Sequence, residues 1–221
     1  MPLKTFHNLK KSRKAEVLQV SYEEFVFHSY KNASVSNIVK RLGIAKGSFY
    51  RYFESKLDLY TFLTKNAYYL RIQQLGILLE DMSLDFFEIL KENFRNKILF
   101  DIKHPLESIF LFNLFQETDT NEIALLYNNI KHEAINLTKN LVIQFQEKGT
   151  LNPLVDPEVA AHFVFQTQLG IYEYLSFSKE INFKENIKTG QKVFDLSEEE
   201  IMEVVEEFLA IIRNGLEIKK D

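Results

Sequence analysis

The chain has 221 residues, of which 46% are hydrophobic and none is cysteine, so it can bury a sizeable core but can form neither disulfides nor Cys-ligated zinc sites. The first 56 residues carry 11 Lys/Arg and 4 acids, net +7, whereas the rest carries 16 and 27, net −11. A basic segment ahead of an acidic body indicates a polyanionic partner for that segment. No apolar run approaches the roughly 20 residues of a membrane span. We therefore expect a cytoplasmic protein with no membrane association.

The N-terminal part predicts three short helices. Apolar residues recur at helical spacing in each, and strand-like alternation is scarce. Ser34 is a capping residue for the second helix, and Gly43 ends it, with a third helix beginning near Ala45. The buried positions expected here are Leu18, Tyr22, Phe25, Val26, Ile38, Val39, Leu42, Phe49 and Phe53.

The remainder also predicts helices, over 56–80, 84–100 and 105–116, then one that Asp119 and Glu122 open and Gly149 ends, and two more over 156–175 and 197–216. Asp156-Pro157 supplies an N-cap and a first-turn proline, and Ser197 with Glu200 forms a capping box. The polar segment 178–196 is predicted to be a loop. The last helix has apolar residues on two faces, so it is either central or shared with a partner chain. The fold class predicted is all-α.

Two helices joined at Gly43 have the spacing of a helix-turn-helix. Its second helix would expose Lys46, Gly47, Ser48, Tyr50 and Arg51, whose side chains or close backbone suit phosphates and base edges. A phosphate cradle for a nucleotide is disfavoured, because the segment lacks a complete Walker A pattern and follows a helix. A purely structural role would explain Phe49 and Phe53, which we expect to be buried. It would leave Tyr50, Tyr52 and Arg51 unexplained.

The stretch "ASVSNIVKRLGIAKGSFYRYFESKLDLY" (33–60) resembles the DNA-binding segment of TetR-family transcriptional regulators. The resemblance implies a three-helix helix-turn-helix DNA-binding domain over 1–56 and a larger helical domain for effector binding and dimerisation over 57–221. It departs from the usual pattern at Ser29-Tyr30, where Gly-Tyr is common. The DNA contacts that it implies are Val35, Ser36, Ile44, Ala45, Lys46, Gly47, Ser48, Tyr50, Arg51 and Lys56.

The resemblance further implies a homodimer that binds a near-palindromic operator in double-stranded DNA, one recognition helix for each half-site. The last long helices would form the interface between protomers, through Phe163, Thr167, Ile171, Val204, Val205, Phe208 and Ile212. A small, largely apolar effector in the body would weaken DNA binding. Candidate ligand contacts are Phe86, Phe110, Asn113, Gln116, Tyr127, Phe163 and Gln166.

No pattern in the chain indicates catalysis, a cofactor or a metal. The sequence has no Gly-x-Ser-x-Gly, no paired-carboxylate motif and no glycine-rich dinucleotide loop. His104, His132 and His162 lie on separate predicted helices without ligand spacing. The hypothesis is therefore a non-enzymatic, ligand-responsive repressor. Two alternatives stay open, namely an effector-independent architectural or nucleoid protein of the same fold, and a helical interaction protein with a basic head.

Overall fold

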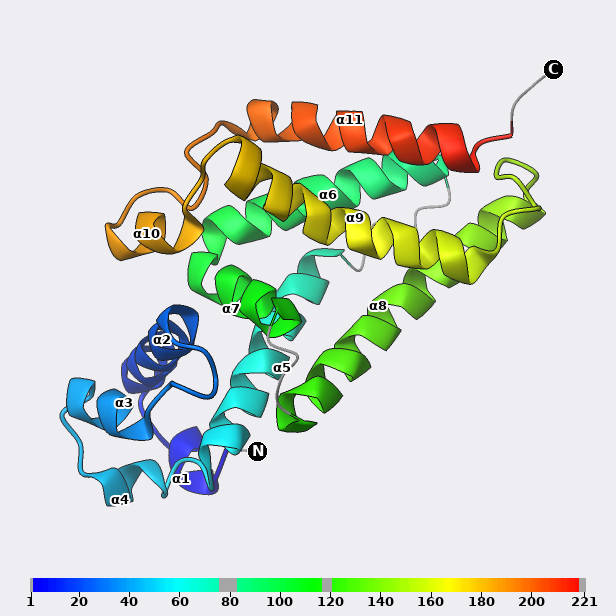
Figure 1. Cartoon of the computed structure of the whole chain (residues 1–221). Coiled ribbons are helices and arrows are strands. Elements are labelled where there is room, and N and C mark those ends of the chain that lie inside the picture. The colour runs from blue at the N-terminus through cyan, green and yellow to red at the C-terminus, as the bar shows by residue number, and fades with distance from the viewer. Residues whose placement is uncertain (1, 76–82, 117–120, 219–221) are drawn as a thin grey trace. The chain divides into compact units, whose positions relative to one another are not determined.

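The structure is a computed structural model that describes residues 2–75, 83–116 and 121–218. Over these residues every extended regular element is a helix, so the predicted all-α class is confirmed (Figure 1). The chain divides into two compact units, one of Met1–Ile72 with His104–Tyr127 and one of Gln73–Lys103 with Asn128–Asp221. The functional boundary predicted after residue 56 is a different division, which these units do not test, and it stays a prediction.

The first unit contains α1 (Lys4–His7), α2 (Lys11–Phe27), α3 (Val35–Arg41), α4 (Lys46–Phe49), most of α5 (Lys56–Leu75) and α7 (Pro105–Gln116). α2 packs against both α7 and α3. Aromatic rings fill the space between α2, α5 and α7, with the ring centroid of Tyr60 lying 5.0 Å from Phe25 and 4.9 Å from Phe110. This cluster joins elements that are far apart in the sequence into one core.

Buried polar groups tie α2 to its neighbours in this unit. The hydroxyl of Tyr22 donates to the carbonyl of Leu63 at 2.9 Å and accepts the amide of Asn66 at 3.1 Å. Burial raises the pKa of Tyr22, which therefore stays a neutral donor. On the other side, the amide of Asn113 in α7 donates to the carbonyl of Val26 at 3.1 Å. Both contacts satisfy backbone oxygens that water cannot reach.

The second unit contains α6 (Phe86–Lys103), most of α8 (Asn121–Glu147), α9 (Pro157–Ser178), α10 (Phe183–Lys188) and α11 (Glu198–Leu216). α11 packs on α6 and α9 and buries Ile201, Val205 and Ile212 almost completely. An ion pair between Lys91 and Glu206 also joins α6 to α11. α11 is therefore central to this unit, one of the two roles expected for a helix with two apolar faces.

Helix caps in the second unit follow the sequence closely. Asp156 accepts the backbone N–H groups of the first turn of α9, and Gly149 has the positive φ, 72°, of a helix-ending residue. The side chain of Ser197 and that of Glu200 form the predicted capping box of α11. Hydrogen bonds from Ser197 hold the pKa of Glu200 below its usual range.

The segment 178–196 was predicted to be a loop, and this is wrong in part. It contains the short helix α10, which begins after Asn182 because the Asn182 side chain accepts the N–H of Glu185. Phe183 is buried against Tyr172 and Phe194, with ring centroids 5.5 and 5.7 Å away. Long-range burial of two phenylalanines therefore orders a segment whose local composition is polar.

Candidate nucleic-acid interface

The start of α3 is fixed by a buried acid on α2. Glu24 is 3% exposed, and its Oε1 accepts the backbone N–H of Ser34 at 2.8 Å and the amide of Asn37 at 3.3 Å. The Ser34 hydroxyl in turn accepts the N–H of Ser36. Together these bonds satisfy donors at a helix start and set the direction of α3 relative to α2. Sequence reasoning missed Glu24, because nothing in the local pattern distinguishes it from the adjacent Glu23.

The turn after α3 depends on Gly43, which has φ of 64°. The N–H of Ile44 donates to the carbonyl of Val39 and the N–H of Gly43 to that of Lys40, the pair of bonds that defines a Schellman motif. Arg13 of α2 donates to the carbonyl of Leu42 at 2.9 Å. Both ends of α3 are thus held by α2, which makes the helix-turn-helix a rigid unit.

α4 is four residues long and depends on packing for its position. Phe49 and Phe53 are buried at 1% and 0% exposure, with ring centroids 5.8 Å apart. Because these rings face inward, Tyr50 and Arg51 lie exposed beside them. The predicted division of the aromatic cluster, with two rings buried and Tyr50 outward, is confirmed.

Gly47 lies on the exposed side of α4, and nothing within the chain requires a glycine there. A Cβ atom built at Gly47 meets no atom within 4 Å. A glycine in a helix costs stability relative to alanine. Packing among the described residues therefore gives no reason for a glycine at this position, and its contact with DNA stays a prediction.

The side chain of Lys56 binds the loop between α2 and α3. Its Nζ donates to the carbonyls of Tyr30 at 2.7 Å and Ala33 at 3.1 Å, and it lies 4.5 Å from the centroid of the Tyr30 ring. These contacts brace the loop that leads into α3. The phosphate contact predicted for Lys56 stays a prediction, and its structural role was not foreseen.

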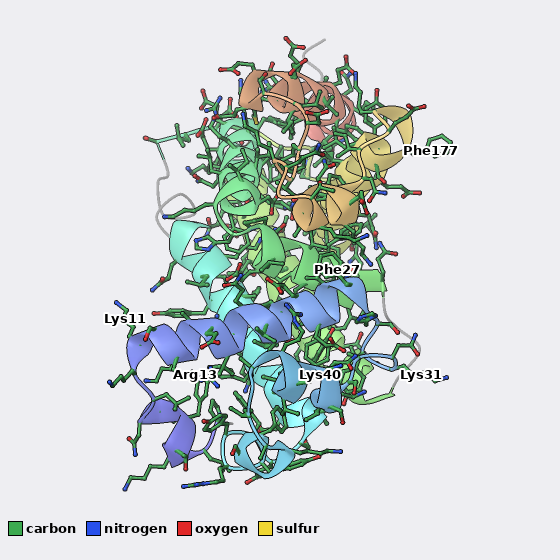
Figure 2. All side chains as sticks on the ribbon, turned by 90° about the vertical axis from the view of Figure 1, so that its left-hand side faces the viewer. Lys11, Arg13, Phe27, Lys31, Lys40 and Phe177 are labelled. Carbon is green, nitrogen blue, oxygen red and sulfur yellow. The ribbon has the colours of Figure 1, made fainter. Side chains whose placement is uncertain are left out.

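The other predicted DNA contacts lie on or beside α3 and α4 in one unit. Exposed residues among them are Ser36, Ala45, Lys46, Gly47, Tyr50 and Arg51, and half-buried ones are Val35, Ile44 and Ser48. Figure 2 shows Lys40 on α3 below the long axis of α2, which begins at Lys11 and ends at Phe27. The structure therefore brings this set together, while its contact with DNA stays a prediction.

The predicted ligand residues are dispersed. Phe110, Asn113, Gln116 and Tyr127 belong to the first unit, and Phe86, Phe163 and Gln166 to the second. Phe110, Asn113 and Phe86 are buried, Tyr127 is half-buried, and the other three are exposed. Asn113 bonds to the end of α2, so its amide has a structural partner. Their participation in a ligand site stays a prediction.

The predicted interface residues are largely buried within the chain. Thr167, Ile171, Val204, Val205 and Ile212 contribute to the core of the second unit, and Phe208 is half-buried. Of the set, only Phe163 is exposed, at 50%. The exposed apolar residues of the same two helices are Val159, Phe163, Phe177 and Ile211. Figure 2 shows Phe177 pointing away from α9.

Among the described residues, no three or more His, Asp or Glu side chains come together in a group that could hold a metal ion. None of the described helices is both long enough and apolar enough to span a membrane.

Comparison with known proteins finds a family match in the helix-turn-helix segment. Residues 17–61 match the family model described as bacterial regulatory proteins, tetR family. A TetR family transcriptional regulator from Chloroflexus aurantiacus J-10-FL is 25% identical, with 99% of this chain and 100% of that chain covered and a TM-score of 0.78. Residues 17–61 therefore have the sequence typical of bacterial regulatory proteins of the tetR family, and the chain shares the fold of a TetR family transcriptional regulator. The matched segment spans most of α2, then α3, α4 and the start of α5, the elements that build the helix-turn-helix.

Other TetR-fold structures are more distant in sequence. AibR, solved in complex with isovaleryl coenzyme A and operator DNA, is 19% identical, with 91% of this chain and 97% of that chain covered and a TM-score of 0.65. The fatty acid degradation regulator FadR from Bacillus halodurans is also 19% identical, with 91% and 98% covered and a TM-score of 0.68. No curated protein matches the chain by sequence.

Proposed function

We propose that this protein is a homodimeric repressor of the TetR family that binds a near-palindromic operator and releases it when a small, largely apolar ligand binds. The observation that carries the proposal is the rigid helix-turn-helix, whose short second helix exposes Lys46, Gly47, Tyr50 and Arg51. The proposed role is non-enzymatic. This role requires access to DNA, so we propose that the protein is located in the cytoplasm.

In the proposed complex α4 enters the major groove. Lys46 and Arg51 would pair with phosphate oxygens or guanine edges, and Tyr50 would donate its hydroxyl to a phosphate. Gly47 would let the backbone approach the duplex. Lys56 would act through position, because its ammonium braces the loop that leads into α3. Val35, Ile44 and Ala45 would contribute apolar contacts, such as those that thymine methyl groups accept.

A dimer would use the exposed apolar residues of α9 and α11. Val159, Phe163 and Phe177 on α9 are 50% to 85% exposed, and Ile211 on α11 is 63% exposed. These residues have no role in the chain's own core, and burying them would remove apolar area from water. A two-fold interface on these helices would present two helix-turn-helix elements to two half-sites, which accounts for the proposed palindrome.

Ligand response has a physical route within the first unit. Asn113 of α7 holds the last turn of α2, and α2 holds the two ends of α3 through Glu24 and Arg13. A ligand that shifted α7 would therefore bias the direction of α3 and α4. Such a ligand lowers DNA affinity by the difference between its affinities for the two arrangements. AibR, a protein of the same fold, has been solved in complex with isovaleryl coenzyme A and operator DNA, which supports the binding of a small molecule by this fold.

Selection of bound duplexes from a random pool, using the full chain, tests the proposal. We expect enrichment of a single sequence with two-fold symmetry and a footprint over both half-sites. An architectural protein would bind without enriching any sequence, and an interaction protein would retain no duplex. Loss of the footprint on adding an acyl-chain or aromatic ligand from a small panel would identify the effector class.

A further inference from the structure

The segment before the matched family region is folded onto the helix-turn-helix. Residues 2–16 precede the family match, yet the N–H of Leu3 donates to the carbonyl of Tyr52 at 2.8 Å. Phe6 in α1 is 3% exposed, and its ring centroid lies 5.0 Å from Phe53 and 5.6 Å from Phe62. A backbone bond and a buried ring therefore fix α1 in place.

This docking places α1 next to the element that we propose enters the groove. Phe53, which Phe6 contacts, also packs on Phe49 of α4 at 5.8 Å between centroids. Tyr52, whose carbonyl holds Leu3, directly follows Arg51. Figure 1 shows α1 and α4 close to each other in the first unit. Phe53 thus packs on α1 through Phe6 and on α4 through Phe49, so that a single side chain links the two helices.

The docked segment is uniformly basic. Residues 2–14 contain five Lys/Arg and no acid. Lys4, Lys10 and Lys11 are exposed, and over the described ranges none of the three forms an ion pair with an acidic side chain. Arg13 differs, since it pairs with Glu16 and bonds to Leu42. The three lysines therefore lie on the docked helix and on the segment that follows it, Lys4 on α1 and Lys10 and Lys11 at the start of α2 (Lys11 is labelled in Figure 2).

We infer that residues 2–11 form a second DNA contact, in which Lys4, Lys10 and Lys11 bind the sugar–phosphate backbone that flanks the groove entered by α4. A duplex carries one negative charge about every 1.7 Å of its axis, so an element beside the groove meets phosphates whatever the sequence. Ammonium groups bind phosphate as point charges, and contacts to phosphate carry no sequence information. The contact would raise affinity for all duplexes and leave the choice of operator to α4. This inference rests on the proposed DNA-binding function.

The test compares the full chain with a triple variant, Lys4→Gln, Lys10→Gln and Lys11→Gln. The matched control is Lys179→Gln, Lys184→Gln and Lys192→Gln, three exposed lysines of the second unit that change the net charge equally. Binding of the duplex selected from the random pool, and of a scrambled duplex of equal length, is measured by fluorescence anisotropy at several salt concentrations. Circular dichroism melting curves check that both variants are folded.

The first variant should lose affinity for both duplexes by a similar factor, so that their ratio stays near the wild-type value. The slope of log affinity against log salt should fall in magnitude by about 2.7 for each protomer, at roughly 0.9 per phosphate contact. The control should keep the wild-type slope. Affinity and slope equal to those of the control would overturn the inference, whereas failure of the wild-type chain to prefer the selected duplex would instead overturn the proposed function.

The variant Phe6→Ala tests whether the position of the three lysines matters as well as their number. It keeps every lysine but removes the ring that docks α1 between Phe53 and Phe62. We expect a smaller loss of affinity than in the triple variant, again shared by both duplexes. A parallel flotation assay with vesicles of phosphatidylcholine and phosphatidylserine tests whether the lysines bind an anionic membrane surface in place of DNA. Loss of vesicle binding by the triple variant with unchanged DNA affinity would overturn the inference in favour of a membrane contact.

Discussion

Substitution of Gly43 by alanine should lower the stability of the protein, whereas substitution of Gly47 by alanine should raise the stability and lower the affinity for DNA. The two glycines lie four residues apart, on either side of the start of α4, and a Cβ atom meets nothing within 4 Å at either position. They differ in backbone conformation, because Gly43 has φ of 64° and Gly47 has no positive φ. The comparison therefore isolates backbone strain from contact with a partner.

The structure sets the expected sizes. Gly43→Ala forces a side chain into the left-handed region, which costs about 1–2 kcal/mol in the folded state. In Gly47→Ala the helical backbone suits alanine, so stability should rise by about 0.4–1 kcal/mol through the unfolded chain. In the proposed complex, however, the added methyl group would lie where the duplex backbone approaches, and we expect affinity to fall at least tenfold, about 1.4 kcal/mol.

Thermal unfolding followed by circular dichroism measures the first effect, and anisotropy of the labelled, selected duplex measures the second. Gly43→Ala should lower the melting temperature by a few degrees, since about 1 kcal/mol corresponds to roughly 2–4 °C in a chain of this size. Gly47→Ala should melt no lower than wild type. Wild-type affinity in Gly47→Ala would refute the close approach of α4 to DNA, and wild-type stability in Gly43→Ala would refute the strain argument.

Four further predictions address other parts of the molecule. Lys46→Ala should weaken operator binding and lower the salt slope by about 0.9 per protomer if the lysine contacts phosphate, with an unchanged melting temperature, and equal binding would remove it from the interface. Ile211→Glu should give a monomer by light scattering. The control Leu154→Glu, at a loop position that is 91% exposed, should stay a dimer. A dimeric Ile211→Glu variant would exclude this interface. Asn113→Leu should destabilise the protein by about 1–3 kcal/mol in chemical unfolding, because it leaves buried carbonyls of α2 without a donor, and a neutral effect would contradict that role. The lowered pKa of Glu200 means that its carboxylate stabilises the fold above the ordinary glutamate pKa and loses this effect as pH falls through the lowered value, so the melting temperatures of Glu200→Gln and wild type should differ at pH 7 and converge in acid.

Local signals in the sequence predicted most of the helix ends. The capping roles of Ser34, Asp156 and Ser197 and the turn at Gly43 were each visible within four residues of chain, and each is confirmed. Caps and turns are decided by neighbouring residues, so a short window is sufficient. The separation of Phe49 from Tyr50 also followed from helical periodicity.

Contacts between distant residues were not predictable in this way. Glu24 holds Ser34 across ten residues, Lys56 holds Tyr30 across 26, and Asn113 holds Val26 across 87. Nothing in the local pattern distinguishes these polar side chains from exposed ones. The predicted interface residues stay a prediction, because periodicity identifies an apolar face without saying whether the chain itself or a partner covers it; Val205, for example, is buried within the second unit.

The docked α1 illustrates the same limit. Four residues of helix are too short to be recognised by periodicity, and the segment reads only as a basic terminus. Its position depends on Phe6 reaching Phe53 and Phe62, which come together only in the folded unit. The charge of the segment was predictable, whereas its attachment beside α4 was not.

The central claim is that α4 and its flanking residues read a specific operator. Its most direct test is the ratio of affinities of the full chain for the selected duplex and for a scrambled duplex of equal composition, measured at one salt concentration for wild type and for Arg51→Ala. The wild-type protein should prefer the selected duplex by a factor of at least about 10³, typical of specific DNA binding, and Arg51→Ala should bind it more weakly at an unchanged melting temperature. A wild-type ratio near one, or a ratio and affinity unaffected by the substitution, would contradict the account.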